Sequence, residues 1–217
     1  MIAQNVEKIF KQIPSHVTVV AAVKTRSVEM VNEAYQAGIT HFGHNYVQEA
    51  ASMLPQITFN ATWHMIGHLQ RNKTKQALQL FDQIDSLDSI RLATELEKQA
   101  AQFGRTVPVL IEVNSGEEDD KTGIEPENAL ELAQFISTLA HLKLVGVMTM
   151  GPRFGDPESS REYFKKTRVV YEQIEKNSLP QVSLQYLSMG MSNDYLVAIE
   201  EGANVVRLGT AIFEEQK

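Results

Sequence analysis

Lys24 occupies a position at which a lysine can do covalent chemistry. It directly follows residues 17–23, an apolar run rich in Val and Ala in which β-branched residues do not alternate with polar ones. Such a run is typical of a buried parallel strand. A lysine at the end of that strand can point inward, where loss of hydration favours the neutral amine, which attacks aldehydes and forms Schiff bases. The alternative is a lysine whose stem packs at the strand end while its ammonium stays in water.

Two turns near the end of the sequence combine small residues in a way that suits phosphate. The segments "YLSMGMSNDY" (186–195) and "VVRLGTAIFEEQK" (205–217) each leave an apolar run and enter a helical pattern. Backbone N–H groups, a helix N-terminus and hydroxyls favour phosphate, and Gly190 and Gly209 carry no Cβ that would keep it away. The alternative is two ordinary turns with helix caps. A phosphate site together with Lys24 predicts a phosphorylated aldehyde as ligand, and pyridoxal phosphate has both groups.

Three further side chains near the ends of apolar runs are candidates for the same site: Asn45, His64 and Met148. Asn45 is equally suited to cap the helix that follows it, and His64 to be a hydrogen-bonded histidine of the core. The acidic run "GEEDDKTG" (116–123) is expected to be a solvated loop, because its carboxylates lack the ligand spacing of a metal site.

The elements that must position these residues alternate along the sequence. Strand patterns cover eight segments: 17–23, 40–43, 62–67, 81–87, 107–113, 143–150, 184–189 and 205–208. Helical periodicity covers 1–15, 27–38, 45–54, 88–104, 125–140, 158–177 and 192–202. The predicted N-caps of these helices are Ser27, Asn45, Asp88 and Ser192.

Eight alternating units predict a single α/β domain over residues 1–217, folded as a closed (β/α)₈ TIM barrel. An open doubly wound sheet is the alternative, although no G-x-G-x-x-G turn follows the first strand. In a barrel the active site forms at the C-terminal ends of the strands, and phosphate binds in the loops after strands seven and eight. Lys24 and both small-residue turns should therefore meet at one end of the barrel.

Composition narrows the possible partners. The formal net charge of -7 gives no electrostatic reason to expect nucleic acid or an anionic membrane as a partner. The sequence has no Cys, which excludes disulfides, thiolate metal sites and cysteine nucleophiles. Residues 1–15 lack the apolar core of a signal peptide, and no apolar run is long enough for a membrane span. We therefore expect a cytoplasmic protein without a metal site.

The sequence resembles the pyridoxal phosphate homeostasis proteins, which are single-domain barrels of the type of the alanine racemase N-terminal domain (fold type III of the enzymes that use pyridoxal phosphate). The resemblance runs nearly end to end. It rests on the motifs "VAAVKT" (20–25), "FGHNYVQEA" (42–50), "WHMIGHLQRNK" (63–73), "IDSLDSIRLA" (84–93), "VLIEVNSGEEDDKTGI" (109–124), "LVGVMTMGP" (144–152) and "LSMGMSNDYLVAIEEGANVVRLGTAIF" (187–213).

The resemblance implies roles for individual residues. Lys24 would hold pyridoxal phosphate as an internal aldimine, and Arg207 would face the pyridine nitrogen. The implied phosphate contacts are Ser188, Gly209 and Thr210, with help from the loop backbone of Met189, Gly190, Met191 and Ser192. The residues implied to line the pocket near the ring are Asn45, His64 and Met148.

Two residues depart from the family pattern near the expected site. Val23 stands before Lys24, where the family usually has Ser or Thr, and His44 replaces the acid of the usual Gly-Glu-Asn. Both are expected to alter ring contacts or cofactor affinity.

Three functions are compatible with these residues. The favoured one, implied by the resemblance, is a monomeric binding protein that holds pyridoxal phosphate and delivers it to apo-enzymes that need it, without catalysis. The second is a racemase-like enzyme that uses the same cofactor. The third is a barrel enzyme acting on another phosphorylated aldehyde or sugar. Against the second, a fixed positive charge on Arg207 disfavours protonation of the pyridine nitrogen and weakens the ring as an electron sink. The tyrosine base that racemase relatives take from an additional domain is also expected to be absent.

Overall fold

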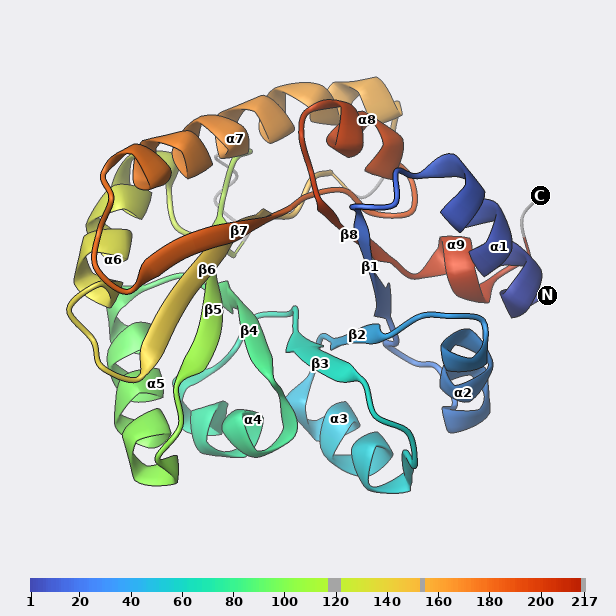
Figure 1. Ribbon diagram of the computed structural model, residues 1–217, viewed down its shortest axis with the longest axis horizontal. Coiled ribbons are helices and arrows are strands. Elements are labelled where there is room, and N and C mark those ends of the chain that lie inside the picture. Colours follow the sequence, from blue (N-terminus) through green and yellow to red (C-terminus); the bar gives the residue numbers. More distant parts are fainter. Residues whose placement is uncertain (117–121, 153–154, 216–217) are drawn as a thin grey trace.

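Eight parallel strands close into a barrel in the computed structural model, which describes residues 1–116, 122–152 and 155–215 (Figure 1). The strands are β1 (Thr18–Ala22), β2 (His41–His44), β3 (Thr62–Met65), β4 (Gln83–Leu87), β5 (Val107–Val113), β6 (Leu142–Thr149), β7 (Val182–Ser188) and β8 (Val205–Leu208). Each strand pairs with the next, and β1 pairs with β8, where Val20 lies opposite Arg207. This closure confirms the predicted (β/α)₈ barrel and excludes the open sheet.

Helices surround the barrel on its outside (Figure 1). The α-helices are α1 (Ile2–Gln12), α2 (Val28–Gln36), α3 (Val47–Met53), α4 (Thr74–Leu80), α5 (Ile90–Phe103), α6 (Ala129–Ile136), α7 (Arg161–Lys176), α8 (Tyr195–Glu200) and α9 (Thr210–Phe213). Short 3₁₀ turns precede or follow them at η1 (Leu54–Gln56), η2 (Arg71–Lys73), η3 (Pro126–Asn128) and η4 (Pro157–Ser160). Of the described helices, none is long and apolar enough to cross a bilayer.

The side chains of the first strand alternate between the outer and the inner side of the barrel wall. Val19, Ala21 and Val23 point outward into the main core, which fills the space between strands and helices. Val20 points inward and packs with Ala22 in a smaller cluster inside the barrel. Because side chains alternate along a strand, Lys24 continues the inward series of Val20 and Ala22.

The predicted strands are all present, with ends displaced by at most two residues. The helix caps agree less well. Ser27 caps α2 by accepting a hydrogen bond from the Met30 backbone, as predicted. Asn45 does not cap α3, because Tyr46 stands at that position without a side-chain cap bond. Ser89, and not the predicted Asp88, caps α5. The pattern also does not predict α4, which is short and has no capping side chain.

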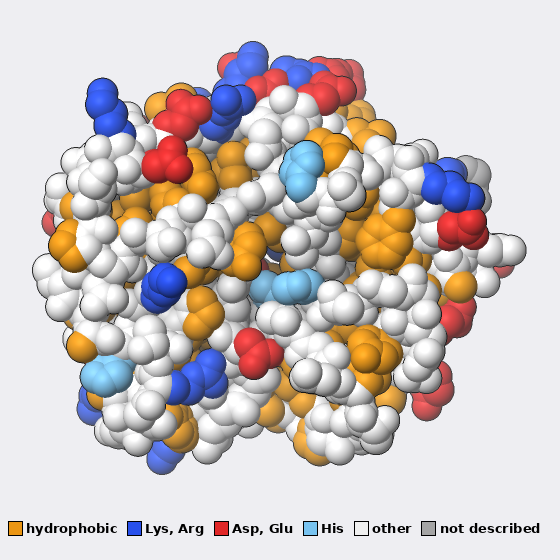
Figure 2. All heavy atoms as spheres, in the orientation of Figure 1, with side chains coloured by type: hydrophobic (Ala, Val, Ile, Leu, Met, Phe, Trp, Pro, Cys, Tyr) orange, Lys and Arg blue, Asp and Glu red, His pale blue; other side chains and the backbone are white. Residues whose placement is uncertain are grey.

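The two ends of the described chain lie side by side (Figure 1). The Asn5 side chain of α1 donates hydrogen bonds to the carbonyls of Ile212 and Glu214, so the first helix is tied to the segment that follows β8. On the face shown in Figure 2, basic and acidic side chains are interspersed toward the periphery, in agreement with a modest net charge of -7.

Candidate functional site

A cavity of about 270 Å³ opens where β1 and β8 end. We call it the mouth cavity, and its lining is Ala22, Lys24, Thr25, Arg26, Asn45, Ile66, Met150, Met191, Arg207, Gly209 and Thr210. The structure thus brings together six residues that the sequence predicted for one site. They are Lys24, Asn45, Met191, Arg207, Gly209 and Thr210.

Lys24 stands at the rim of this cavity, partly exposed. Its ammonium lies over the ring of Tyr46, 5.1 Å from the ring centroid, which is a cation–π distance. The next residue, Thr25, adopts a left-handed backbone with φ of 60°, which is uncommon for a residue with a side chain. Its hydroxyl donates to the Lys24 carbonyl at 2.6 Å. The backbone turns sharply after Lys24, and the amine is presented at the open end of the barrel.

Arg207 is the buried cation of the site, with 3% of its surface exposed. Its Nη1 donates to the Ser188 carbonyl and hydroxyl at 3.0 and 2.7 Å, and its Nη2 donates to the Thr149 carbonyl at 2.6 Å. These bonds fix the guanidinium across the inside of the barrel. Burial lowers the pKa of Arg207 from its ordinary value, opposed most strongly by the charge of Asp85. A charge held this rigidly acts as a fixed electrostatic feature of the cavity.

The turn between β8 and α9 presents backbone donors. The N–H groups of Gly209 and Ala211 both donate to the hydroxyl oxygen of Ser192, at 3.1 and 3.0 Å. Ser192 was predicted to cap α8, but it does not. Its hydroxyl oxygen lies against this turn instead. The turn is shaped to receive an oxygen acceptor, which is the property that a phosphate site requires.

The two predicted glycines serve different purposes. A Cβ at Gly190 would lie 2.6 Å from the Cβ of Ala198 and 2.8 Å from the Cα of Tyr195, and Gly190 has a φ of +90°. The packing against α8 therefore requires glycine at position 190, and the predicted approach of a phosphate to Gly190 stays a prediction. A Cβ at Gly209 would meet nothing closer than the Ala22 carbonyl at 3.6 Å, so this position has room toward the cavity.

Six predicted residues do not line the mouth cavity. They are His64, Met148, Ser188, Met189, Gly190 and Ser192. Met148 is fully buried inside the barrel with Leu110 and Val145. Met189 is fully buried on the outer side, in a cluster with Phe164. Contact between any of these six and a cofactor stays a prediction.

His64 belongs to a hydrogen-bonded network inside the barrel, below the mouth. Its Nε2 lies 3.0 Å from Nδ1 of His41, and its Nδ1 lies 3.1 Å from a carboxylate oxygen of Asp85. Gln83 donates to the other oxygen of that carboxylate at 2.8 Å. The core role that the sequence left open for His64 is therefore present.

The two residues that depart from the family pattern do not face the mouth cavity. Val23 is fully buried in the main core. His44 is 1% exposed, and its ring stacks on Trp63 with centroids 6.0 Å apart. Both belong to the outward series of their strands, so the expected effect on ring contacts is not supported by their positions. The sequence motif placed them near Lys24 in the chain, but alternation places them behind the wall.

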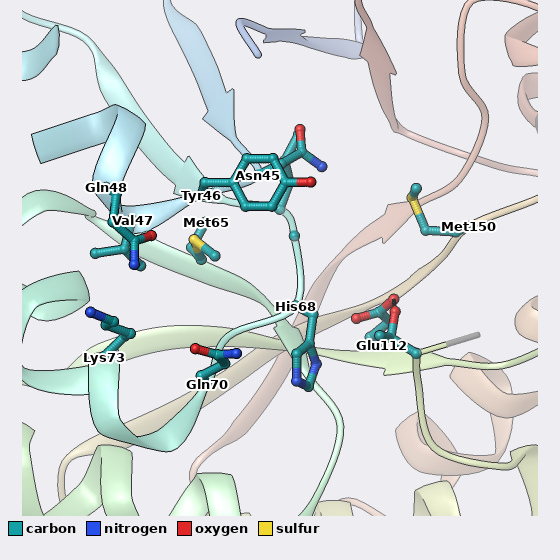
Figure 3. A pocket seen from close by; sticks show the side chains of 13 residues that line it. Asn45, Tyr46, Val47, Gln48, Met65, His68, Gln70, Lys73, Glu112 and Met150 are labelled. Carbon is teal, nitrogen blue, oxygen red and sulfur yellow. Dashed lines mark hydrogen bonds between the residues drawn. The ribbon is translucent and has the colours of Figure 1, made fainter. Parts of the chain in front are cut away.

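A second cavity of about 450 Å³ adjoins the mouth cavity and shares Asn45, Ile66 and Met150 with it. In Figure 3, Asn45 and Tyr46 lie on one side of this space, and Gln70 and His68 lie on the other. This extension was not predicted from the sequence. Polar residues inside the apolar strand patterns, such as the Glu in "VLIEVN", were the available signal.

Glu112 is the buried acid of the second cavity. It is 2% exposed, and its Oε1 accepts from Thr122 at 2.6 Å. Its Oε2 has no hydrogen-bond partner in the described parts of the chain. Burial raises the pKa of Glu112, and the nearby Arg207 charge acts in the opposite direction. The second cavity is thus lined by a buried carboxyl group, and the mouth cavity beside it is lined by the fixed guanidinium of Arg207.

Within the described part of the chain, His, Asp and Glu side chains form no group of three or more suited to a metal ion. Most of the acidic run at 116–123, predicted to be a solvated loop, lies outside the described residues.

Comparisons with known proteins show the family of the chain. The family model described as the alanine racemase N-terminal domain matches residues 1–216. A pyridoxal phosphate homeostasis protein of Aquifex aeolicus is 42% identical over 197 residues, which cover 90% of this chain and 86% of that protein. One of Pasteurella multocida is 39% identical over 218 residues, covering 98% and 93%. The chain belongs to the pyridoxal phosphate homeostasis protein family.

Solved structures of other proteins share this fold. PipY of Synechococcus elongatus, determined with pyridoxal phosphate bound, is 33% identical with a TM-score of 0.89, over 98% of this chain and all of that one. An alanine racemase of Clostridium difficile is 14% identical with a TM-score of 0.79, over 99% of this chain but only 56% of the racemase. The homeostasis family therefore shares its barrel fold with part of the longer racemase chain.

Proposed function

We propose that this protein binds pyridoxal 5′-phosphate at the mouth cavity, with Lys24 as its covalent attachment point, and holds it for delivery to apo-enzymes. The observation that carries the proposal is that Lys24, Arg207 and the Gly209–Thr210 turn line one cavity. The family name and the cofactor-bound PipY structure support the same ligand.

The residues of the cavity fit the chemical groups of this cofactor. Lys24 supplies a primary amine for the aldehyde, and Gly209 and Thr210, at the start of α9, line the same cavity and suit the phosphate. Arg207 supplies a fixed positive group beside the space left for the ring. When bound, pyridoxal phosphate supplies an aldehyde that condenses with amines and a ring that serves as an electron sink.

We further propose that the protein holds the cofactor without catalysing a reaction of its own. Racemisation requires an acid–base group on each face of the reacting carbon. The Lys24 ammonium lies over the Tyr46 ring, 5.1 Å from its centroid, and Tyr46 is not part of the mouth cavity lining. The Tyr195 hydroxyl donates to Gln12 of α1 at 2.9 Å, and Tyr195 is not part of the cavity lining. Neither tyrosine is therefore placed to be the opposing base. The fixed charge on Arg207 also disfavours protonation of the ring nitrogen.

The experiment that tests the binding site is covalent mapping. The purified protein is saturated with pyridoxal phosphate, reduced with borohydride, digested and analysed by mass spectrometry. We expect one adduct, on Lys24, and none in the Lys24→Ala variant. Lys73 lines the adjoining cavity and is the internal control, so an adduct found mainly on Lys73 would overturn the assignment.

We also propose that the protein is a monomeric, single-domain cytoplasmic protein. Its partners are the cofactor and the apo-enzymes that receive it. Native mass spectrometry of the loaded protein tests the first point, because a dimer mass at low micromolar concentration would contradict it. Transfer is tested by mixing loaded protein with an apo-enzyme that requires pyridoxal phosphate and following recovery of its activity.

A further inference from the structure

An open groove of about 780 Å³ lies on the surface between η2 and the first turns of α5. We call it the basic groove, and its lining is Arg71, Asn72, Ile90, Arg91, Thr94 and Glu95. Because α5 packs against both η2 and α4, the two walls of the groove are held together by the fold. No residue of this lining belongs to the mouth cavity or to the second cavity.

Two arginines give the basic groove its charge. Arg71 and Arg91 are exposed, and neither guanidinium forms a hydrogen bond or an ion pair within the described parts of the chain. Glu95 is the acidic residue of the lining, and its Oε1 accepts a hydrogen bond from Gln99 at 2.7 Å. Two accessible guanidiniums against one carboxylate leave the groove with a positive balance. Since a guanidinium pairs with a carboxylate through two parallel hydrogen bonds, the groove favours carboxylates.

The start of α5 adds to this charge and also supplies an apolar contact. Arg91 is the second residue of this helix of 14 residues, whose first turn carries no acidic side chain. The positive end of the helix therefore reinforces the arginines. Ile90, the first residue of α5, is 39% exposed although it is a large apolar side chain. A ligand that matches the groove carries an apolar group beside its carboxylates.

The openness of the basic groove favours a protein segment over a small molecule. Small-molecule sites enclose most of the surface of their ligand. Here all the lining residues except Glu95 are exposed, so the groove can cover only one side of whatever lies in it. A nucleic acid is disfavoured, because the net charge of the whole chain is -7. An acidic stretch of another protein meets both conditions.

The groove lies beside the cavities proposed to hold the cofactor. Arg71 and Asn72 line the groove, while Gln70 and Lys73, their neighbours in the chain, line the second cavity. The second cavity in turn adjoins the mouth cavity, with which it shares three residues. A protein seated in the groove would therefore stand next to the path by which the cofactor leaves.

We infer that the basic groove docks an acidic segment of the apo-enzyme that receives the cofactor. Carboxylates of the segment pair with Arg71 and Arg91, and an apolar side chain between them packs on Ile90. The identity of the partner rests on the proposed function, whereas the preference of the groove for an acidic segment does not. Such a contact relies on exposed charges, so it speeds encounter and then lets go, as a transfer requires.

Fluorescence anisotropy tests the groove with the protein free of cofactor. The probe is the fluorescein-labelled peptide Glu-Glu-Leu-Glu-Glu, and the comparison peptide has Ser in place of Leu. We expect saturable binding of the first peptide, weakened by rising sodium chloride because the paired charges are exposed. The second peptide should bind several-fold more weakly, because it lacks the apolar side chain that packs on Ile90.

Variants of exposed residues locate the bound peptide. Arg71→Glu combined with Arg91→Glu should weaken binding about tenfold or more, because two attractions become repulsions. Lys8→Glu combined with Lys176→Glu is the matched control, since it changes the net charge equally at exposed positions of α1 and α7, and it should bind like the parent. Ile90→Ser should bind the Leu and Ser peptides equally.

Transfer of the cofactor tests the identity of the partner. Loaded protein is mixed with an apo-enzyme from the same organism, and recovery of its activity is timed. The double arginine variant should transfer about tenfold more slowly than the double lysine control, while both release pyridoxal phosphate into buffer at the same rate. Equal transfer rates would overturn the partner assignment.

Three results would overturn the groove itself: no peptide binding, equal weakening in the two double variants, or tighter binding of a DNA oligonucleotide than of the peptide. None of these results bears on the cofactor site, because the peptide titration contains no pyridoxal phosphate. Failure of the covalent mapping at Lys24 would contradict the proposed function and leave the peptide result standing.

Discussion

Arg207 and Ser188, from neighbouring strands β8 and β7, are joined by two hydrogen bonds from a single nitrogen. Nη1 of Arg207 donates to the Ser188 hydroxyl at 2.7 Å and to the Ser188 carbonyl at 3.0 Å. Ser188 is fully buried and stands beneath the guanidinium, outside the lining of the mouth cavity. The hydroxyl is thus positioned to hold the arginine in place.

Ser188→Ala tests this relationship. Loss of a hydrogen bond to a buried charge should reduce the free energy of unfolding by roughly 1.5–3 kcal/mol, measured by urea denaturation. Affinities for pyridoxal phosphate and for unphosphorylated pyridoxal should fall by the same factor, because Ser188 acts through Arg207. A loss confined to the phosphorylated ligand would instead show that the hydroxyl contacts the phosphate.

Thr210→Val tests whether the turn between β8 and α9, at Gly209 and Thr210, binds phosphate. The substitution keeps the side-chain shape and removes a hydroxyl, and a hydrogen bond to a charged group contributes roughly 1.5–3 kcal/mol. Affinity for pyridoxal phosphate should therefore fall about tenfold or more, while affinity for pyridoxal should barely change. Fluorescence titration with both ligands measures this. Equal losses would indicate general damage to the protein.

Gly190→Ala and Gly209→Ala form a matched pair. At Gly190 the new methyl group would overlap Ala198, and the backbone has a φ of +90°. The free energy of unfolding should therefore fall by roughly 1–3 kcal/mol. At Gly209 the φ is −112° and the nearest atom is 3.6 Å away, so the change should be within about 0.5 kcal/mol. Urea denaturation of both variants decides; similar losses would refute the distinction.

His44 predicts a pH dependence of stability. Burial lowers the pKa of His44 from 6.5 to about 4. Between those values the unfolded chain binds more protons than the folded protein, so stability is full above pH 6.5 and declines as the pH falls through this window. A shift of this size corresponds to about 3 kcal/mol at most. His44→Phe should lose less stability than the parent between pH 7 and pH 4.5 in urea denaturation, and parallel curves would contradict the assignment.

The absence of racemase chemistry is tested by deuterium exchange. Wild-type protein loaded with pyridoxal phosphate is incubated with L-alanine in heavy water, and exchange at the α-carbon is followed by NMR. We expect the rate to equal that of the Lys24→Ala variant, because neither Tyr46 nor Tyr195 lines the mouth cavity. Faster exchange that depends on Lys24 and yields D-alanine would restore the enzymatic reading.

Sequence pattern predicted the barrel well because the evidence is local. The apolar run at residues 17–23 predicted a buried strand, and the structure places Val19 and Ala21 in the main core and Val20 inside the barrel. Eight such strands separated by helices leave few topologies other than closure.

Depth along the barrel was harder to predict, because it depends on strand tilt and register between strands that are distant in sequence. His64 is inward-facing, but Ile66, the next inward residue, is the one that lines the mouth cavity. In the same way Met148 lies one inward position below Met150, which lines it. The structure therefore places His64 and Met148 on the inner side of β3 and β6, one inward position below the residues that line the mouth cavity, and their contact with a cofactor stays a prediction.

The pairing of β1 with β8 has a consequence for the protein during its synthesis. Lys24 follows the first strand of the barrel, and the Gly209 turn follows the last. While the barrel is being synthesised, Lys24 is therefore made well before the turn that shares its cavity. Contacts between such distant segments form late in folding. Because a ligand that binds only the closed barrel stabilises that state by mass action, cofactor availability should favour chains that have completed closure over those still exposing the unpaired edges of β1.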